Sequence, residues 1–167
     1  MKKKAGYSLW LLPEKKISNK LSRVINLYAK KYNLPKFLPH ITINDFPHKK
    51  YIDLININNF KKIKIYINDI KKKNFFFYSI FLDIKPKKKL INLHKKNNLI
   101  SNKVKFNPHL SLVYTNNKLL KKKIFKEIKI NNDFKNYSFF CDQLAFINFN
   151  EIKKEWKIIK KIKLIGT

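Results

Sequence analysis

The sequence contains only two glycines and one cysteine among its 167 residues. Gly6 and Gly166 stand at opposite ends of the chain, so they cannot form the glycine-rich loops that hold phosphates in Walker-type and dinucleotide-binding proteins. Cys141 has no second cysteine with which to form an intrachain disulfide. These shortages argue against a doubly wound nucleotide-binding fold and against a disulfide-stabilised secreted domain.

Long apolar segments are also missing. The most hydrophobic stretch, residues 75–82, ends at Asp83 and is far shorter than the roughly 20 residues that a membrane-spanning helix needs. The basic start of the chain is followed by only four apolar residues, 9–12, before Pro13, which argues against a signal peptide. Together with the single cysteine, this pattern leads us to expect an intracellular, cytoplasmic protein that has no membrane association.

Acidic residues and arginine are scarce, whereas lysine is abundant. The chain has 10 acidic and 39 basic residues, a net charge of +29, and Arg23 as its only arginine. Proteins that read nucleic-acid sequence rely on arginine for bidentate base contacts. The lysines are spread along the whole chain with many Asn, Ile and Phe residues, a composition typical of an AT-rich genome. The charge therefore favours an anionic substrate over a dedicated polynucleotide groove.

The length and the hydrophobic fraction of 44% fit one domain over residues 1–167, and we expect a monomer. Apolar periodicity and breaker residues predict strands at 7–12, 41–46, 64–67, 75–84, 110–114, 137–149 and 156–164. Helices are predicted at 18–32, with Ser18 as the cap, and at 50–60, 86–100 and 118–129. The order of elements is similar in the two halves of the chain. We therefore predict an α+β fold with internal pseudo-symmetry.

One seven-residue pattern occurs twice. Residues 37–43 read FLPHITI and residues 106–112 read FNPHLSL. Both segments have phenylalanine, proline and histidine at the same positions, and both have a hydroxyl residue two positions after the histidine. Two of the four histidines lie in this repeat. A chance match over seven positions is improbable even in this biased composition, so the pattern indicates a functional site.

The spacing within the repeat suggests acid–base chemistry. On a strand, residues i and i+2 project from the same face, so His40 shares a face with Thr42, and His109 with Ser111. If the two strands lie side by side, both imidazoles and both hydroxyls line one groove. One imidazole can take a proton from water while the other gives one to a leaving oxygen. The hydroxyls can donate hydrogen bonds to phosphate oxygens.

We expect this site to need no metal and no cofactor. A zinc site needs three or four ligands, and no cysteine or acidic residue recurs with the motif. His48 and His94 have no hydroxyl two residues later and no repeat partner, so we expect them at the surface. Cys141 and Trp10 are expected in the core, as is the aromatic stretch 75–82.

The paired motifs resemble those of the two-histidine (2H) phosphoesterase superfamily, and in particular its cyclic phosphodiesterase branch, known in plants and yeast. The opening YSLWLLP, residues 7–13, is similar to the first strand of that branch, and FFYSIFL, residues 76–82, to its central aromatic strand. PHLSLVY, residues 108–114, is close to its second motif, including Tyr114, and the ending around Trp156 also looks familial. The resemblance covers nearly the whole chain.

This resemblance implies a bilobal domain made of two pseudo-symmetric lobes of antiparallel sheet and helices, with the active-site cleft between them. It implies hydrolysis of a small cyclic phosphate, either ADP-ribose 1″,2″-cyclic phosphate or a nucleoside 2′,3′-cyclic phosphate. It also implies that Tyr114 contacts the substrate, that His109 activates water and that His40 protonates the leaving oxygen. Where the branch has a polar residue on the aromatic strand, this chain offers Tyr78 or Ser79.

Three other functions stay open. Relatives in the same superfamily act on RNA ends with 2′,3′-cyclic or 2′-5′ linkages, and the excess of lysine fits an RNA substrate. Cleavage of cyclic nucleotide second messengers is a further possibility within the same chemistry. A basic RNA-binding module whose histidines only contact phosphate is the alternative from a different class. The matched pairs of histidine and hydroxyl argue against that last reading, because binding alone requires no acid and base.

Overall fold

The computed structural model of the chain describes residues 5–55, 60–98, 106–131, 134, 136–150 and 155–166. Its strands are β1 (Ala5–Pro13), β2 (Ile41–Phe46), β3 (Ile63–Lys72), β4 (Ile80–Ile84), β5 (His109–Val113), β6 (Ser138–Asn150) and β7 (Glu155–Lys163). Its helices are α1 (Lys15–Tyr32), α2 (Lys50–Asp53), α3 (Lys88–Asn97), α4 (Lys118–Asn131) and the short 3-10 helix η1 (Phe76–Tyr78). The order β1-α1-β2-α2-β3 recurs as β4-α3-β5-α4-β6.

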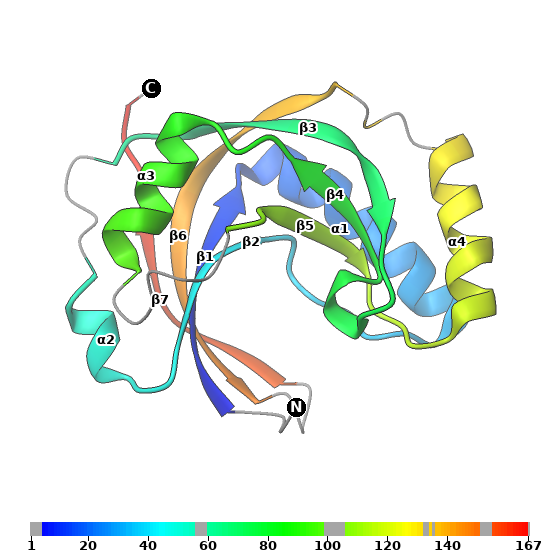
Figure 1. Cartoon of the computed structure of the whole chain (residues 1–167), viewed down its shortest axis with the longest axis horizontal. Helices are drawn as coiled ribbons and strands as arrows, with labels where there is room; N and C mark the ends of the chain where they lie inside the picture. The colour runs from blue at the N-terminus through cyan, green and yellow to red at the C-terminus, as the bar shows by residue number, and fades with distance from the viewer. Residues whose placement is uncertain are drawn as a thin grey trace.

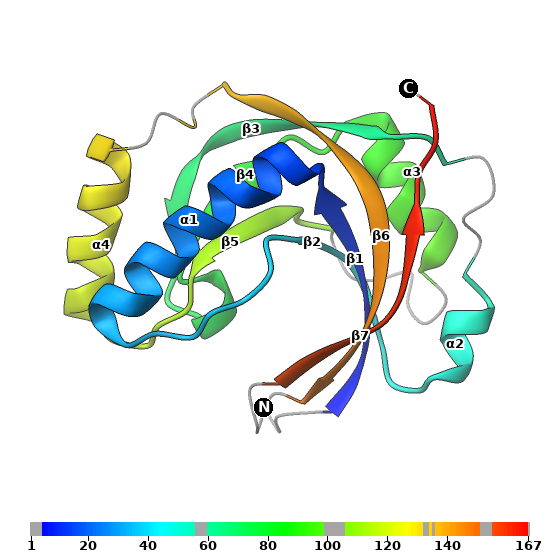
Figure 2. The same cartoon turned by 180° about the vertical axis from the view of Figure 1, so that it is seen from behind.

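The strands hydrogen-bond into one antiparallel sheet in the order β1-β2-β5-β4-β3-β6-β7, and β1 also pairs with β6. The long β6 strand pairs with three other strands. Its first residues pair with β3, and the rest of the strand runs between β1 and β7. The sheet bends into an arch as a result (Figures 1 and 2). Mixed helices and antiparallel strands confirm the predicted α+β class.

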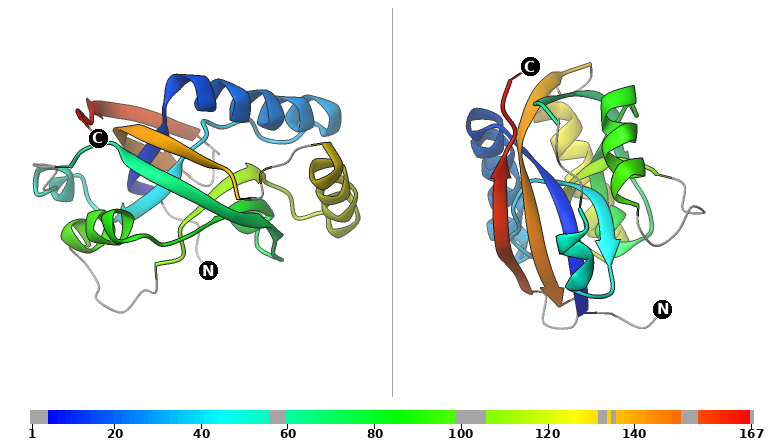
Figure 3. Two further views of the ribbon diagram at one scale, coloured as in Figure 1. Left: turned by 90° about the horizontal axis from the view of Figure 1, so that it is seen from above. Right: turned by 90° about the vertical axis from the view of Figure 1, so that its left-hand side faces the viewer.

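The longer helices pack on the outside of this arch. Helix α1 lies against β5 and β1, α3 against β2, and α4 against β3. Seen from above, α1 and α3 cover opposite sides of the strands (Figure 3, left). Helix α1 is amphipathic: Leu21, Ile25 and Tyr28 are buried at helical spacing, whereas Leu27 is exposed. The helices therefore leave the inner side of the arch uncovered.

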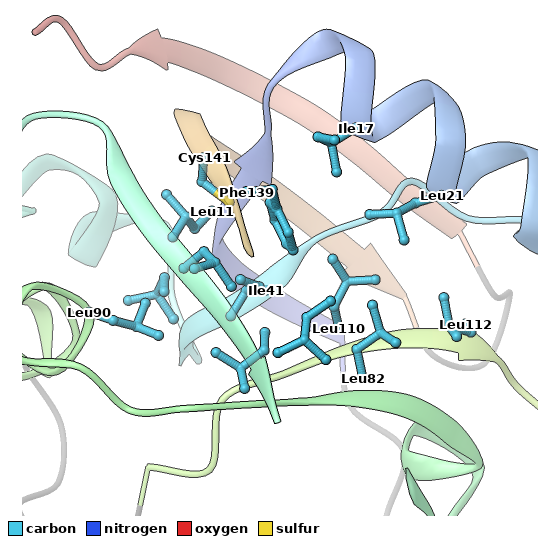
Figure 4. Packing of buried hydrophobic residues seen from close by; sticks show 14 of the residues in the cluster. Leu11, Ile17, Leu21, Ile41, Leu82, Leu90, Leu110, Leu112, Phe139 and Cys141 are labelled. Atoms are coloured by element: carbon cyan, nitrogen blue, oxygen red, sulfur yellow. The ribbon is translucent and has the colours of Figure 1, made fainter. Parts of the chain in front are cut away.

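The alternation of side chains along β1 separates the core from that inner side. Leu9 and Leu11 enter the main core, which also contains Ile41, Leu110 and Cys141 (Figure 4). The residue between them, Trp10, faces the other way and packs in a second, smaller cluster with Leu12, Ala145 and Ile147. The prediction that Cys141 is a core residue is confirmed, since its side chain is fully buried.

Three sequence-based predictions about local structure are wrong. Helix α1 begins at Lys15, and Ser18 is not its cap, because the Ser18 amide already donates to the Glu14 carbonyl within the helix. Helix α2 covers only Lys50–Asp53 of the predicted 50–60, of which 56–59 lie outside the described residues. The predicted strand 75–84 is strand only from Ile80, because η1 and Ser79 form the turn that returns the chain from β3.

The prediction of two lobes and that of a single domain stay predictions, since the strands form one continuous sheet that does not by itself divide the chain. In the part of the chain that the structure describes, no helix combines the length and apolarity needed to cross a membrane.

Candidate active site

The two copies of the motif lie side by side on adjacent antiparallel strands. β2 and β5 pair through Ile41 and Leu110, both of which are fully buried. Extending this antiparallel register by one residue in each direction places His40 opposite Ser111, and Thr42 opposite His109. Each histidine therefore faces the hydroxyl residue of the other motif. The sequence repeat has become an approximate two-fold arrangement on one face of the sheet.

All five predicted site residues line one cleft, of about 320 Å³: His40, Thr42, His109, Ser111 and Tyr114. The remaining lining residues are Ser8, Trp10, Asp45, Phe77, Tyr78, Phe149 and Trp156. Asp45 lies on β2; the others come from β1 and from the ends of β6 and β7 on one side, and from η1 on the other (Figure 1). Segments distant in sequence thus meet around the paired histidines.

The two imidazoles are held in the same way. Nδ1 of His40 lies 2.6 Å from the Leu38 carbonyl oxygen, and Nδ1 of His109 lies 3.1 Å from that of Asn107. A carbonyl oxygen only accepts hydrogen bonds, so each Nδ1 must carry a hydrogen. The neutral rings therefore have an unprotonated Nε2, and no described residue hydrogen-bonds to either Nε2. Each histidine presents a nitrogen that can accept a proton.

Each imidazole also rests on an aromatic ring. The indole of Trp10 stacks on His40 with ring centroids 3.5 Å apart and planes 7° apart. Tyr78 stacks on His109 at 4.0 Å and 29°, and Phe81 packs edge-on against His109 at 5.5 Å. The ring stack fixes the plane of each imidazole, and the backbone hydrogen bond fixes its rotation within that plane. Trp10 is thus a buried residue, as predicted, and also part of the cleft wall.

Burial shifts the protonation of both histidines. Desolvation of His40, which is 8% exposed, lowers its pKa to about 4, a shift that the Leu38 carbonyl opposes and the nearby His109 reinforces. The pKa of His109 is also lowered by desolvation, opposed by the Asn107 carbonyl, and Lys73 lowers it further. At neutral pH and without substrate, His40 is therefore neutral.

The two hydroxyls of the motif differ in their bonding. The Ser111 hydroxyl is buried and donates to the Phe77 carbonyl oxygen at 2.9 Å. The Thr42 hydroxyl, by contrast, has no hydrogen-bond partner among the described residues and lines the cleft. Thr42 is therefore a free donor, whereas Ser111 must give up a backbone hydrogen bond to donate to a ligand.

Tyr114 is packed within a cage of aromatic rings. Phe37 stacks on it at 4.0 Å, Phe76 at 5.5 Å and Phe77 edge-on at 5.3 Å, and only 5% of Tyr114 is exposed. Burial raises the pKa of its hydroxyl to about 12, despite a hydrogen bond with Ser111 that lowers it. Tyr114 thus contacts the motif hydroxyl and the cleft at once. Phe76 and Phe77 were predicted to lie in a core strand. They lie instead in the 3-10 helix η1 and pack against the Tyr114 ring.

The expectation that His94 is a surface residue is wrong. His94 lies on α3 and is half-buried, with Nδ1 2.8 Å from the Ile43 carbonyl oxygen and 2.7 Å from the Asn44 side-chain oxygen. Its ring stacks on Phe106, the first residue of the second motif, at 4.2 Å and 6°. His94 therefore contacts both motifs, the first through Ile43 and the second through Phe106. Helical position alone could not reveal this, because the contacts come from segments distant in sequence.

No three His, Cys, Asp or Glu side chains within the described ranges gather closely enough to hold a metal ion. His48 is exposed and lies beside Tyr51, outside the cleft, as predicted.

Solved structures with this fold include phosphoesterases. A crystal structure described as a phosphoesterase superposes with a TM-score of 0.63 at 12% identity, covering 97% of this chain and 99% of that one. Escherichia coli LigT complexed with 3′-AMP gives 0.61 at 12% identity over the same shares. A Thermus thermophilus protein gives 0.63 at 10% identity, covering 96% of this chain and 98% of its own. At such identities the likeness establishes the fold alone, which this chain shares with LigT and with the other two proteins.

One curated protein is similar to this chain in sequence. The cyclic phosphodiesterase of Arabidopsis thaliana is 25% identical over 121 residues, which cover 67% of this chain. The match spans 66% of the plant protein's length, just under two thirds. No protein-family model matches the sequence. The fold, the paired motifs and this similarity all agree with the resemblance to the 2H phosphoesterase superfamily and to its plant cyclic phosphodiesterase branch.

Proposed function

We propose that this protein hydrolyses a cyclic phosphodiester, with His40 and His109 as its acid–base pair and without a metal ion. The observation that carries the proposal is the identical mounting of the two imidazoles: each Nδ1 donates to a backbone carbonyl, and each Nε2 is left for the cleft. A module that only binds phosphate would gain nothing from two matched proton acceptors, because an ammonium or a guanidinium binds the anion more strongly.

The reaction needs one proton removed and one supplied. One neutral imidazole accepts a proton at Nε2 from a water molecule as the water oxygen bonds to phosphorus. The bond from phosphorus to one ring oxygen breaks, and the other histidine, protonated at Nε2, gives its proton to that oxygen. The products are a phosphate monoester and a free hydroxyl. Thr42 donates to a nonbridging oxygen, where negative charge builds up, and Ser111 does so when it turns from Phe77.

We assign the base to His109 and the acid to His40, as the family resemblance implies. Lys73 disfavours the charged form of His109, which suits a proton acceptor. His40 is neutral before substrate binds, so it must take up its proton as the substrate enters. A phosphate anion beside a buried imidazole provides the reason, because their attraction is strong where water is excluded.

The substrate we propose is small: ADP-ribose 1″,2″-cyclic phosphate or a nucleoside 2′,3′-cyclic phosphate. A cleft of about 320 Å³ is at the lower end of the usual range for small-molecule sites. Phe149 and Trp156 in its wall offer flat apolar surfaces to a base or sugar. The similarity to a protein named cyclic phosphodiesterase supports the same choice.

The direct test is an assay of adenosine 2′,3′-cyclic phosphate and ADP-ribose 1″,2″-cyclic phosphate in the presence of EDTA, with identification of the monoester product. We expect turnover that chelation does not reduce. Loss of activity on chelation, restored by one divalent ion, would contradict metal independence. Binding without turnover of any cyclic phosphate would instead favour the RNA-binding alternative.

The assignment of acid and base has its own test. In the His40→Ala variant the residual turnover titrates through His109 alone. If His109 is the base, that turnover rises with pH through the pKa of His109, because only the neutral ring accepts a proton. Residual turnover that falls with rising pH would reverse the two roles.

A further inference from the structure

A second, cationic groove lies beside the cleft, and of its lining residues only Lys73 enters the mechanism above. Its volume is about 800 Å³, and five lysines, with Asn74, Phe75 and Leu119, line it: Lys72, Lys73, Lys118, Lys121 and Lys122. The end of β3 and the turn after it form one wall, and the first turn of α4 forms the other (Figure 1). None of the lining residues is acidic.

Lys121 sets this groove apart from the many solvated lysines of the chain. Its side chain is 4% exposed, and it is the one buried lysine among the described residues. Its ammonium donates to the Lys73 carbonyl oxygen at 2.8 Å, which uses one of its three hydrogens. Burying a charge without an opposite charge is costly, and this position on an amphipathic helix could have held an apolar residue.

The charges around Lys121 increase that cost. Its pKa is lowered by burial and then by the positive charges of Lys118 and Lys72. The acidic residues of the flanking β3 and α4 are occupied elsewhere: Asp69 pairs with Lys129, and Glu127 pairs with Lys31. Three ammonium groups thus converge where the described residues supply no counter-charge. An anion bound among them would remove the repulsion and compensate the buried charge.

The groove is linked to the catalytic cleft by a third depression, which shares lining residues with both. Lys73 lines the groove and also this third depression, which includes Tyr78 and His109, both of which line the cleft. Its ammonium lies 5.3 Å from the centre of the Tyr78 ring, on which His109 stacks. One extended ligand can therefore contact His109 and the groove together.

From this arrangement we propose that the groove of Lys72, Lys118 and Lys121 is a second phosphate-binding site, which holds another phosphate group of the same substrate. This inference rests on the proposed function. It specifies the substrate class: a cyclic phosphate that carries at least one further phosphate, as a diphosphate-linked sugar or a strand of nucleotides does. Phe75, which is 69% exposed at the edge of the groove, offers a surface on which a base can stack.

The test compares adenosine 2′,3′-cyclic phosphate with the same compound carrying a 5′-phosphate. In the Lys72→Ala/Lys118→Ala variant we expect KM for the 5′-phosphorylated substrate to rise about 10-fold while kcat stays the same, because a remote contact is lost equally from ground and transition states. KM for the substrate with one phosphate should change less than about twofold. The matched control is Lys126→Ala, an exposed lysine on the same helix that does not line the groove.

Two further arms complete the experiment. ADP-ribose 1″,2″-cyclic phosphate and a cyclic-ended trinucleotide, assayed with the same variants, identify which source of the second phosphate the groove favours. Lys121→Met, which keeps the length of the side chain, should reproduce the KM effect and raise the melting temperature, since it removes an unpaired buried charge. If the variant and the wild type handle all substrates alike, the second site is wrong while the proposed function stands. If the wild type turns over none of them, the proposed function itself fails.

Discussion

The imidazole of His40 stacks on the indole of Trp10 almost in parallel, with ring centroids 3.5 Å apart. His109 and Tyr78 form the equivalent stack on the other strand pair. Each catalytic ring in our proposal therefore has an aromatic support from a neighbouring segment, in addition to the repeated motif itself. These supports exclude water from the rings and so lower the pKa of each.

Replacing Trp10 with leucine should expose His40 to water. Because desolvation is the largest cause of its low pKa, we expect the pKa of His40 to rise from about 4 toward its ordinary value, and turnover to fall about 10-fold as the ring loses its orientation. Titration of the imidazole signals by NMR measures the first effect. Trp156→Leu is the control, since Trp156 lines the cleft without stacking on His40. If the pKa of His40 in this variant equals that of the wild type, the Trp10 indole does not cause the desolvation of His40.

The same low pKa makes stability depend on pH. Between about pH 6.5 and pH 4 the unfolded chain binds a proton at His40 that the folded protein does not. This contribution to stability is therefore complete above pH 6.5 and is lost as the pH falls through about 4. Its full size is about 3 kcal/mol. Urea unfolding at several pH values should show a steeper loss for wild type than for His40→Gln. Equal slopes in the two proteins would contradict the burial of a neutral His40.

The hydroxyls of the two motifs should respond differently to removal. Thr42→Val takes away a free donor, so we expect a loss of about 2–4 kcal/mol in kcat/KM with little change in melting temperature. Ser111→Ala also removes the hydrogen bond to the Phe77 carbonyl, which should cost about 1 kcal/mol of stability besides lowering turnover. Lower stability with normal turnover in both variants would show that the hydroxyls are only structural.

His94 offers a test of the link between the two motifs. His94→Phe keeps a ring to stack on Phe106 but loses the hydrogen bonds to the Ile43 carbonyl and to Asn44. We expect the free energy of unfolding to fall by about 1 kcal/mol or more, and kcat to fall with KM nearly unchanged, because β2 contains Thr42 and begins directly after His40. If the free energy of unfolding changes by less than about 0.5 kcal/mol and kcat stays normal, His94 behaves as a solvated surface residue.

The sequence predicted the structure best where the repeated motif and the strand periodicity agreed. The repeated motif predicted that His40, His109 and their hydroxyls share a face, and strand periodicity predicted most of β1, β2, β5 and β6. Neither could predict which strands are neighbours, so the position of each histidine opposite the other hydroxyl came only from the register. The turn at η1 was missed because its aromatic residues favour strand, whereas packing around Tyr114 decides their conformation.

The central claim is that His40 and His109 act as one catalytic unit, and the turnover of a double mutant tests it most directly. Turnover of adenosine 2′,3′-cyclic phosphate should be measured in EDTA for wild type, His40→Ala, His109→Ala and the double variant, with folding checked by circular dichroism. We predict that each single variant loses about 10²–10⁴-fold and that the double variant loses far less than the product of the two. Near-normal turnover in either folded single variant would contradict the acid–base pair.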